Sequence, residues 1–244
     1  MYRTAALAAA SAVVLALTPV LTACSSDDSD AKPESAPSSP SSPPVRQMSP
    51  AERIATIMIG PADVEGFSVD EPNQDFVFAK SVEEVEVDRP VCAPLAHAMN
   101  QLPLGDPQSD LTRALTEEAE GLNGAHTYVT LTVYEVGGAQ SALADVRKAV
   151  DSCRTGFTAK ASGGTSAYDS VNEEKVAPAG DEALGFKATM TFRGASHTLH
   201  TQVVRDGDVL GVYFSVNGLA IARATPSDAR LPAAVVKAQN EKLG

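Results

Sequence analysis

The stretch that most constrains the fold of this chain is a run of alternating apolar and polar residues from Ala183 to Asn217. Gly194-Ala195 suits a type II′ turn and Asp206-Gly207 suits a type I′ turn, so we expect antiparallel strands joined by tight hairpins. These turns set a register that gathers the large apolar residues on one face, which a one-residue slip would destroy. The expected pairs are Met190 with Leu199, Ala188 with Thr201, Phe186 with Val203, Leu199 with Phe214, Thr201 with Val212 and Val203 with Leu210.

The opposite face of this meander is polar. In the expected register, Thr189, His200 and Tyr213 form one row across neighbouring strands. Such a row combines hydrogen-bonding groups with aromatic area, as a ligand cleft requires, although an ordinary solvated sheet face has the same pattern. The polar residues of this face are Lys187, Thr189, Thr191, Thr198, His200, Gln202 and Tyr213. We take Thr189, His200, Tyr213, Gln202 and Lys187 from it as candidate ligand-binding residues.

A second alternating segment, residues 126–136, predicts another strand. Its apolar side consists of Val129, Leu131 and Val133, and its other side of Tyr128, Thr130, Thr132 and Tyr134. If this strand lies beside the meander, Tyr128 and Tyr134 extend the candidate ligand-binding face. Gly137-Gly138 then breaks the strand, and a helix up to Cys153 follows.

The N-terminus has the pattern of a bacterial lipoprotein signal. Arg3 precedes a stretch, 5–17, that is almost entirely Ala, Val and Leu, as in a secretory signal. This run is shorter than the about 20 residues that a membrane span requires. Leu21-Thr22-Ala23-Cys24 ends in the cysteine that a lipid-modifying pathway uses, so we expect residues 1–23 to be removed and Cys24 to carry acyl chains such as palmitate. A plain signal peptide followed by an incidental cysteine is the alternative.

This interpretation defines the topology and the domain boundaries. Acyl chains on Cys24 would anchor the protein to the outer face of the cytoplasmic membrane, because two chains already bind a bilayer stably. Residues 24–48 are rich in Ser, Pro and Asp, a composition that cannot form a core and predicts a disordered linker. A single domain, 49–244, begins with Ser49-Pro50-Ala51-Glu52, which is typical of a capping box.

The cysteines outside the signal predict one disulfide. The chain has 3 cysteines, and with Cys24 acylated, Cys92 and Cys153 form the remaining pair in an oxidising compartment. Both lie on the apolar stripe of a predicted helix, so a disulfide would join two helices on their buried sides. A redox or catalytic thiol is the alternative, but there is no Cys-x-x-Cys motif. We therefore expect an α+β fold: a central antiparallel sheet with a C-terminal meander, packed by helices, with one helix-to-helix disulfide.

Charge and motifs exclude several function classes. The chain carries 31 acidic and 19 basic residues, a net charge of −12, so nucleic acid is not an expected partner. Glu84, Glu86 and Asp88 would share one face of a strand, but no calcium-loop pattern accompanies them. His197 and His200 would point to opposite faces of a strand and cannot chelate together. We expect no metal and no cofactor, and no catalytic residues are identified, although an enzymatic site without a motif is possible.

Several short motifs follow one another in a recognisable order. They are Asp63-Val64-Glu65-Gly66-Phe67, Pro90-Val91-Cys92, the helix from Ala142 to Cys153, Gly180-Asp181-Glu182-Ala183, Val204-Arg205-Asp206-Gly207-Asp208 and Gln239 in the last helix. In this order the chain resembles actinobacterial cell-envelope lipoproteins related to the extracellular sensor domain of mycobacterial serine/threonine kinases. The resemblance implies an α+β domain with a ligand-binding cleft. Such sensor domains can carry two disulfides, whereas this chain has cysteines for one, and it contains no kinase domain.

Two functions are consistent with these expectations. The first is an anchored, extracytoplasmic ligand-binding or sensing module without catalysis, whose ligand is an unknown small molecule or cell-envelope component. The second is an accessory protein that docks another envelope protein. A deep polar cleft would favour the first function, and a large exposed apolar patch the second.

Overall fold

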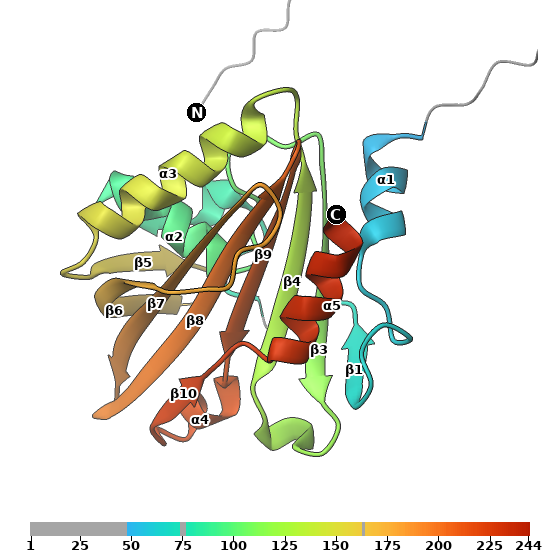
Figure 1. Cartoon of the computed structure of the whole chain (residues 1–244). Helices are drawn as coiled ribbons and strands as arrows, with labels where there is room; N and C mark the ends of the chain where they lie inside the picture. Colours follow the sequence, from blue (N-terminus) through green and yellow to red (C-terminus); the bar gives the residue numbers. More distant parts are fainter. Residues whose placement is uncertain (1–47, 74–76, 163) are drawn as a thin grey trace, which may run out of the picture. The chain divides into compact units, whose positions relative to one another are not determined.

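The computed structural model of the protein describes residues 48–73, 77–162 and 164–244 (Figure 1). The predicted signal peptide, the acylated Cys24 and the linker up to residue 47 lie outside these residues. Within the described part of the chain, no helix has both the length and the apolar character that crossing a bilayer requires.

A 10-stranded sheet forms the centre of the domain (Figure 1). The strand order is β1-β3-β4-β9-β8-β7-β6-β5-β2 with antiparallel neighbours, and β10 pairs with β8 in parallel. The strands are β1 (Phe67–Asp70), β2 (Glu86–Val87), β3 (Ser109–Glu117), β4 (His126–Val133), β5 (Phe157–Ala161), β6 (Gly164–Glu174), β7 (Glu182–Phe192), β8 (Ala195–Asp206), β9 (Val209–Val216) and β10 (Ser227–Ala229). The expected antiparallel sheet and its C-terminal meander, β7-β8-β9, are confirmed.

Helices cover both faces of this sheet (Figure 1). They are α1 (Pro50–Ile57), α2 (Ala93–Ala98), α3 (Gly138–Ser152), α4 (Gly218–Ala222) and α5 (Ala233–Leu243), with 3-10 turns η2 (Val82–Glu84), η3 (Pro90–Cys92) and η4 (Gly121–Asn123). Leu143 and Val146 of α3 are buried in one apolar core with Phe186 and Leu210. Ile54 of α1 and Val235 of α5 belong to a second core on the other face, together with Leu131. The domain is therefore α+β, with a core on each side of the sheet.

The predicted capping box at the start of α1 is confirmed. The Glu52 carboxylate accepts the Ser49 amide at 2.8 Å, and the Ser49 hydroxyl accepts the Glu52 amide at 3.3 Å.

Polar contacts also fix α5 against the end of α1. On α5, the fully buried Gln239 side chain accepts from the Ile59 amide at 2.8 Å and donates to the Ile57 carbonyl at 2.8 Å. Because both ends of this amide are paired to the chain that leaves α1, α5 is held in one position.

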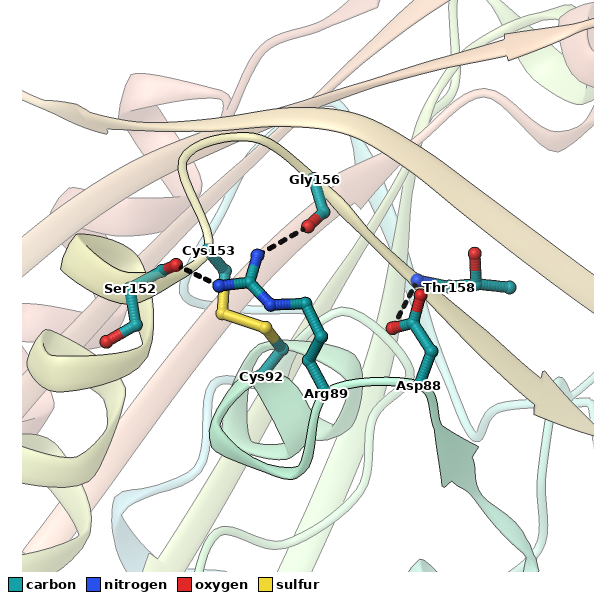
Figure 2. Close-up of a disulfide and its surroundings, with 7 residues drawn as sticks. All are labelled: Asp88, Arg89, Cys92, Ser152, Cys153, Gly156 and Thr158. Atoms are coloured by element: carbon teal, nitrogen blue, oxygen red, sulfur yellow. Dashed lines mark hydrogen bonds between the residues drawn. A yellow bond between two sulfur atoms is a disulfide. The ribbon is translucent and has the colours of Figure 1, made fainter.

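The disulfide between Cys92 and Cys153 is confirmed, with a Cα–Cα distance of 6.0 Å (Figure 2). Cys92 ends η3 and Cys153 directly follows α3, and both are fully buried. Beside it, the Arg89 guanidinium donates to the carbonyls of Ser152 at 2.6 Å and Gly156 at 3.0 Å (Figure 2). The bridge and these bonds attach the η3–α2 segment to the end of α3.

The expected strand register was wrong by two residues at both hairpins. Ala188 pairs with Leu199, and Thr201 pairs with Phe214. The first turn is Arg193-Gly194, with φ of 49° and 83°, which is the pattern of type I′. The second turn is Gly207-Asp208. Gly207 has a φ of 57° and Asp208 does not have a positive φ, as in type II′. A two-residue shift leaves every side chain of the meander on its expected face, so the apolar face is confirmed, while the predicted row on the polar face is not.

The acidic segment before Cys92 also differs from the expectation. Glu84 belongs to η2, and only Glu86 and Val87 form strand β2. The Asp88 carboxylate accepts the Thr158 amide at 2.9 Å (Figure 2). Glu84, Glu86 and Asp88 therefore do not share one strand face, and among the described residues no group of acidic, His or Cys side chains is arranged to hold a metal ion.

Candidate functional site

The predicted row of Thr189, His200 and Tyr213 does not exist. His200 lies opposite Lys187 on β7 and Ser215 on β9. Thr189 is opposite Thr198, and its hydroxyl is 2.7 Å from that of Ser170. Tyr213 lies opposite Gln202. The structure therefore brings together Lys187 with His200, and Gln202 with Tyr213, as two neighbouring pairs on the same face.

Tyr213 is covered by α5 and does not face solvent. Its side chain is fully buried, and its hydroxyl donates to Oδ1 of Asn240 at 2.6 Å. Burial raises the pKa of the Tyr213 hydroxyl far above its ordinary value. The expectation of a polar, open sheet face was therefore wrong at this position, because α5 docks there.

Tyr128 and Tyr134 lie on the opposite face of the sheet from Tyr213. Tyr134 is buried against the start of α3, and its hydroxyl donates to the Leu104 carbonyl at 2.6 Å. Burial raises the pKa of Tyr134 to about 12. Tyr134 therefore anchors the loop at Leu104, whereas Tyr128 is half-buried and lines a cavity.

This cavity, which we call the aromatic cleft, has a volume of about 690 Å³. Tyr128 and Phe214 are directly opposite each other on β4 and β9, with stacked rings whose centroids are 6.2 Å apart. The side chains that define the aromatic cleft are Phe78, Tyr128, Tyr168, Met190, Leu199 and Phe214. Cavities of this size with mainly apolar walls are typical of small-molecule sites.

A few polar groups also face the aromatic cleft. His126 lies at its wall, with Nδ1 2.8 Å from the Thr116 hydroxyl. Gln101 adopts a φ of 61°, and its Oε1 is buried without a hydrogen-bond partner in the described chain. Non-glycine residues with such a backbone conformation are concentrated at ligand sites and turns. The lining also includes Asp70, Glu71, Asn73, Asn100, Thr116 and Ser166, so the cleft combines a large apolar surface with polar and charged groups.

His200 contributes to a different concavity, on the α5 side of the sheet. Its Nδ1 lies 2.7 Å from Glu174 Oε2 and its Nε2 2.6 Å from Asp228 Oδ1. The hydrogen bond with His200 lowers the pKa of Asp228, and Arg230 lowers it further. His200 and Gln202 line this concavity, which we call the α5 groove; its volume is about 850 Å³.

Sequence reasoning identified Tyr128 but not its partners in the aromatic cleft. Phe214 was assigned to the apolar core face, and Tyr168 to a weak strand. Their meeting with Tyr128 depends on β4 lying beside β9 and on β6 lying beside β7. The alternation in residues 126–134 correctly placed Tyr128 and Val129 on different faces. The expectation that Tyr128 and Tyr134 extend the polar face of the meander was wrong, because β4 pairs with β9 in a register that puts Tyr128 opposite Phe214.

Solved structures that are similar to this chain include two mycobacterial proteins. The extracellular domain of PknH from Mycobacterium tuberculosis matches with a TM-score of 0.49 and 10% identity, over 81% of this chain and 95% of that chain. The Rv0999 ortholog of Mycobacterium smegmatis, an uncharacterised protein, matches with a TM-score of 0.33 and 14% identity, over 73% of this chain and 86% of that chain. No protein-family profile matches the sequence, and no curated protein matches it significantly.

Proposed function

We propose that this protein is a membrane-anchored, extracytoplasmic module that binds a small molecule in the aromatic cleft and catalyses no reaction. The observation that carries the proposal is the cleft itself: about 690 Å³ of space on the sheet, walled by aromatic and apolar side chains. Acylation of Cys24 supplies the anchor, and the linker up to residue 48 separates the domain from the bilayer.

The lining of the cleft indicates the class of ligand. Tyr128 and Phe214 present stacked rings from neighbouring strands, and aromatic surfaces of this kind pack best against flat apolar groups. His126 and Gln101 add hydrogen-bonding capacity at the wall. The ligand that fits is therefore a mainly apolar, ring-containing molecule with a small number of polar groups.

A cleft-filling substitution tests this proposal without removing a core residue. Ala114 lines the cleft and lies opposite Tyr128 on β3, so Ala114→Phe would occupy the ligand space. The probe is the fluorescent dye 1-anilinonaphthalene-8-sulfonate, titrated into the folded domain. The matched control is Ala167→Phe, at an exposed position of β6.

The proposal predicts saturable dye binding to the wild type and to Ala167→Phe, and at least tenfold weaker binding to Ala114→Phe. Fractionated envelope extracts that contain the natural ligand should displace the dye. Equal dye affinity for all three proteins, or binding that never saturates, would show that the aromatic cleft is not a ligand site.

A further inference from the structure

The α5 groove lies on the opposite sheet face from the aromatic cleft and is built differently. One wall is the connection between β6 and β7, from Lys175 to Gly180, and the other is α5. The floor is formed by β8, through His200 and Gln202. Figure 1 shows α5 in front of the sheet and the chain after β6 crossing the same face. The residues that line the groove include no aromatic side chain.

The floor of the groove contains a primary amide without a partner. Gln202 is only 5% exposed, and its side chain makes no hydrogen bond to the described residues, but its amide atoms remain open to solvent in the groove. A primary amide can donate two hydrogen bonds and accept two. An amide that lines a cavity and has no partner within the protein is suited to exchange water for a ligand.

A second primary amide lines the same groove. Gln202 is directly opposite Tyr213, and the Tyr213 hydroxyl donates to Oδ1 of Asn240 on α5. This bond fixes Asn240 with its oxygen towards Tyr213, so its NH₂ group is free to donate to a ligand, and Asn240 also lines the groove. The two residues together offer several N–H donors and the Gln202 carbonyl acceptor.

Several charged groups of the groove are paired. Glu174 of the lining and Asp228, which lies outside the lining, both contact the His200 ring, and Arg230 pairs with Asp228 at 2.8 Å. Lys237 lies 3.7 Å from Glu241. The Glu174 and Glu241 carboxylates of the lining are therefore already engaged, and this pairing together with the Lys175 ammonium disfavours a cationic ligand. The remaining wall is apolar, with Val176, Pro178, Ala179, Leu231 and Val236.

We propose that the α5 groove binds a short, extended peptide of small uncharged residues. The peptide group carries one N–H donor and one carbonyl acceptor, which the Gln202 amide can pair with in both directions, while Asn240 donates to a neighbouring carbonyl. The small side chains lie against the apolar walls. A sugar fits this groove less well, because sugar sites commonly use aromatic platforms and the lining has none.

The test is an NMR titration of the ¹⁵N-labelled protein with the capped tripeptide Ac-Ala-Ala-Ala-NH₂. The side-chain NH₂ signals of Gln202 and Asn240 should shift saturably, while Tyr128 in the aromatic cleft should not respond. Gln202→Leu should weaken binding at least tenfold. Asn240→Asp, which keeps the acceptor for Tyr213 but removes the donors, should do the same. Gln140→Leu, at an exposed position of α3, should bind like the wild type.

Several outcomes would overturn the peptide site. They are the absence of saturable shifts at Gln202 and Asn240 in the wild type, shifts confined to the aromatic cleft, and unchanged affinity of Gln202→Leu. A response to N-acetylglucosamine but not to the tripeptide would show that the groove recognises acetamido sugars instead. Because the wild-type titration reads both amides directly, the result does not depend on either variant folding, and it is independent of dye binding in the aromatic cleft.

Discussion

Nε2 of His200 lies 2.6 Å from Oδ1 of Asp228, and this contact joins β8 to β10 at the edge of the α5 groove. The other ring nitrogen lies 2.7 Å from Glu174, at the end of β6. Both bonds can be donated only when the ring carries two N–H groups, as the imidazolium does. His200, which is 3% exposed, is thus a buried link between segments that are distant in sequence.

The contact with His200 predicts that Asp228 makes the free energy of unfolding depend on pH in acid. The pKa of the Asp228 carboxyl is lowered in the folded protein, mainly by the hydrogen bond from His200. A carboxylate with a lowered folded pKa stabilises the fold above its unfolded pKa of about 3.9, and this stabilisation is lost as the pH falls through the folded value. Asp228→Asn should therefore lower the free energy of unfolding at pH 6 and flatten its decrease below about pH 4.

Urea unfolding from pH 2 to pH 6 measures this effect. The control is Asp106→Asn, at an exposed loop position, which should follow the wild-type curve. Parallel curves for the wild type and Asp228→Asn over the whole range would contradict the prediction. Because Asp228 is partly exposed, the expected difference is modest, and the direction of the curvature is the decisive readout.

Removing the disulfide should destabilise the domain strongly. The bridge between Cys92 and Cys153 closes a segment with a sequence separation of 61, for which the loss of unfolded-state entropy corresponds to about 4 kcal/mol. The double variant Cys92→Ala/Cys153→Ala should lose roughly this free energy of unfolding in urea. The reduced wild type is the control and should behave similarly. A loss below about 1 kcal/mol would mean that the buried contacts around α3 suffice without the bridge.

The guanidinium beside the disulfide should contribute independently of it. Arg89 donates to the Ser152 and Gly156 carbonyls (Figure 2), and hydrogen bonds from charged groups contribute about 1.5–3 kcal/mol. Arg89→Met keeps the apolar stem and should lower the free energy of unfolding by about 2 kcal/mol. The control Arg154→Met removes only an exposed pair with Asp151, so its effect should stay within about 1 kcal/mol. Equal effects of both variants would refute this role of Arg89.

Within the meander, the local pattern predicted which face each strand residue occupies, but not the register. Phe186, Leu199 and Phe214 share the apolar face in both the expected and the observed register, because the two differ by an even number of residues. The observed first turn places Arg193 at a φ of 49°, a conformation that non-glycine residues seldom adopt. Turn preferences therefore favoured Gly194-Ala195, and the row built on that turn was wrong.

The α5 groove was harder to predict than the strands, because it depends on long-range packing. The polar face of β8 and β9 reads as solvent-exposed in sequence, yet α5 covers Tyr213 and leaves Gln202 beneath a groove. α5 is held there by the pairing of Gln239 with Ile57 and Ile59 near α1, together with its apolar side in the second core. The separation of Gln239 from Ile59 along the chain is 180 residues, so no local pattern could reveal it.

The unpaired amide of Gln202 makes a final prediction that separates binding from folding. An amide that faces an open groove already pairs with water, so its removal breaks no hydrogen bond within the protein. Gln202→Leu should therefore leave the free energy of unfolding of the free domain within about 0.5 kcal/mol of the wild type, while it weakens tripeptide binding at least tenfold.

Thermal and urea unfolding of Gln202→Leu, with and without the tripeptide, measure both effects. The control Gln140→Leu, at an exposed position of α3, should change the stability by less than about 0.5 kcal/mol. If Gln202→Leu is instead less stable than the wild type by 1 kcal/mol or more, about as for a lost hydrogen bond, then Gln202 is a structural residue. Its amide would then be paired in the free protein, and the free amide on which the peptide site depends would not exist.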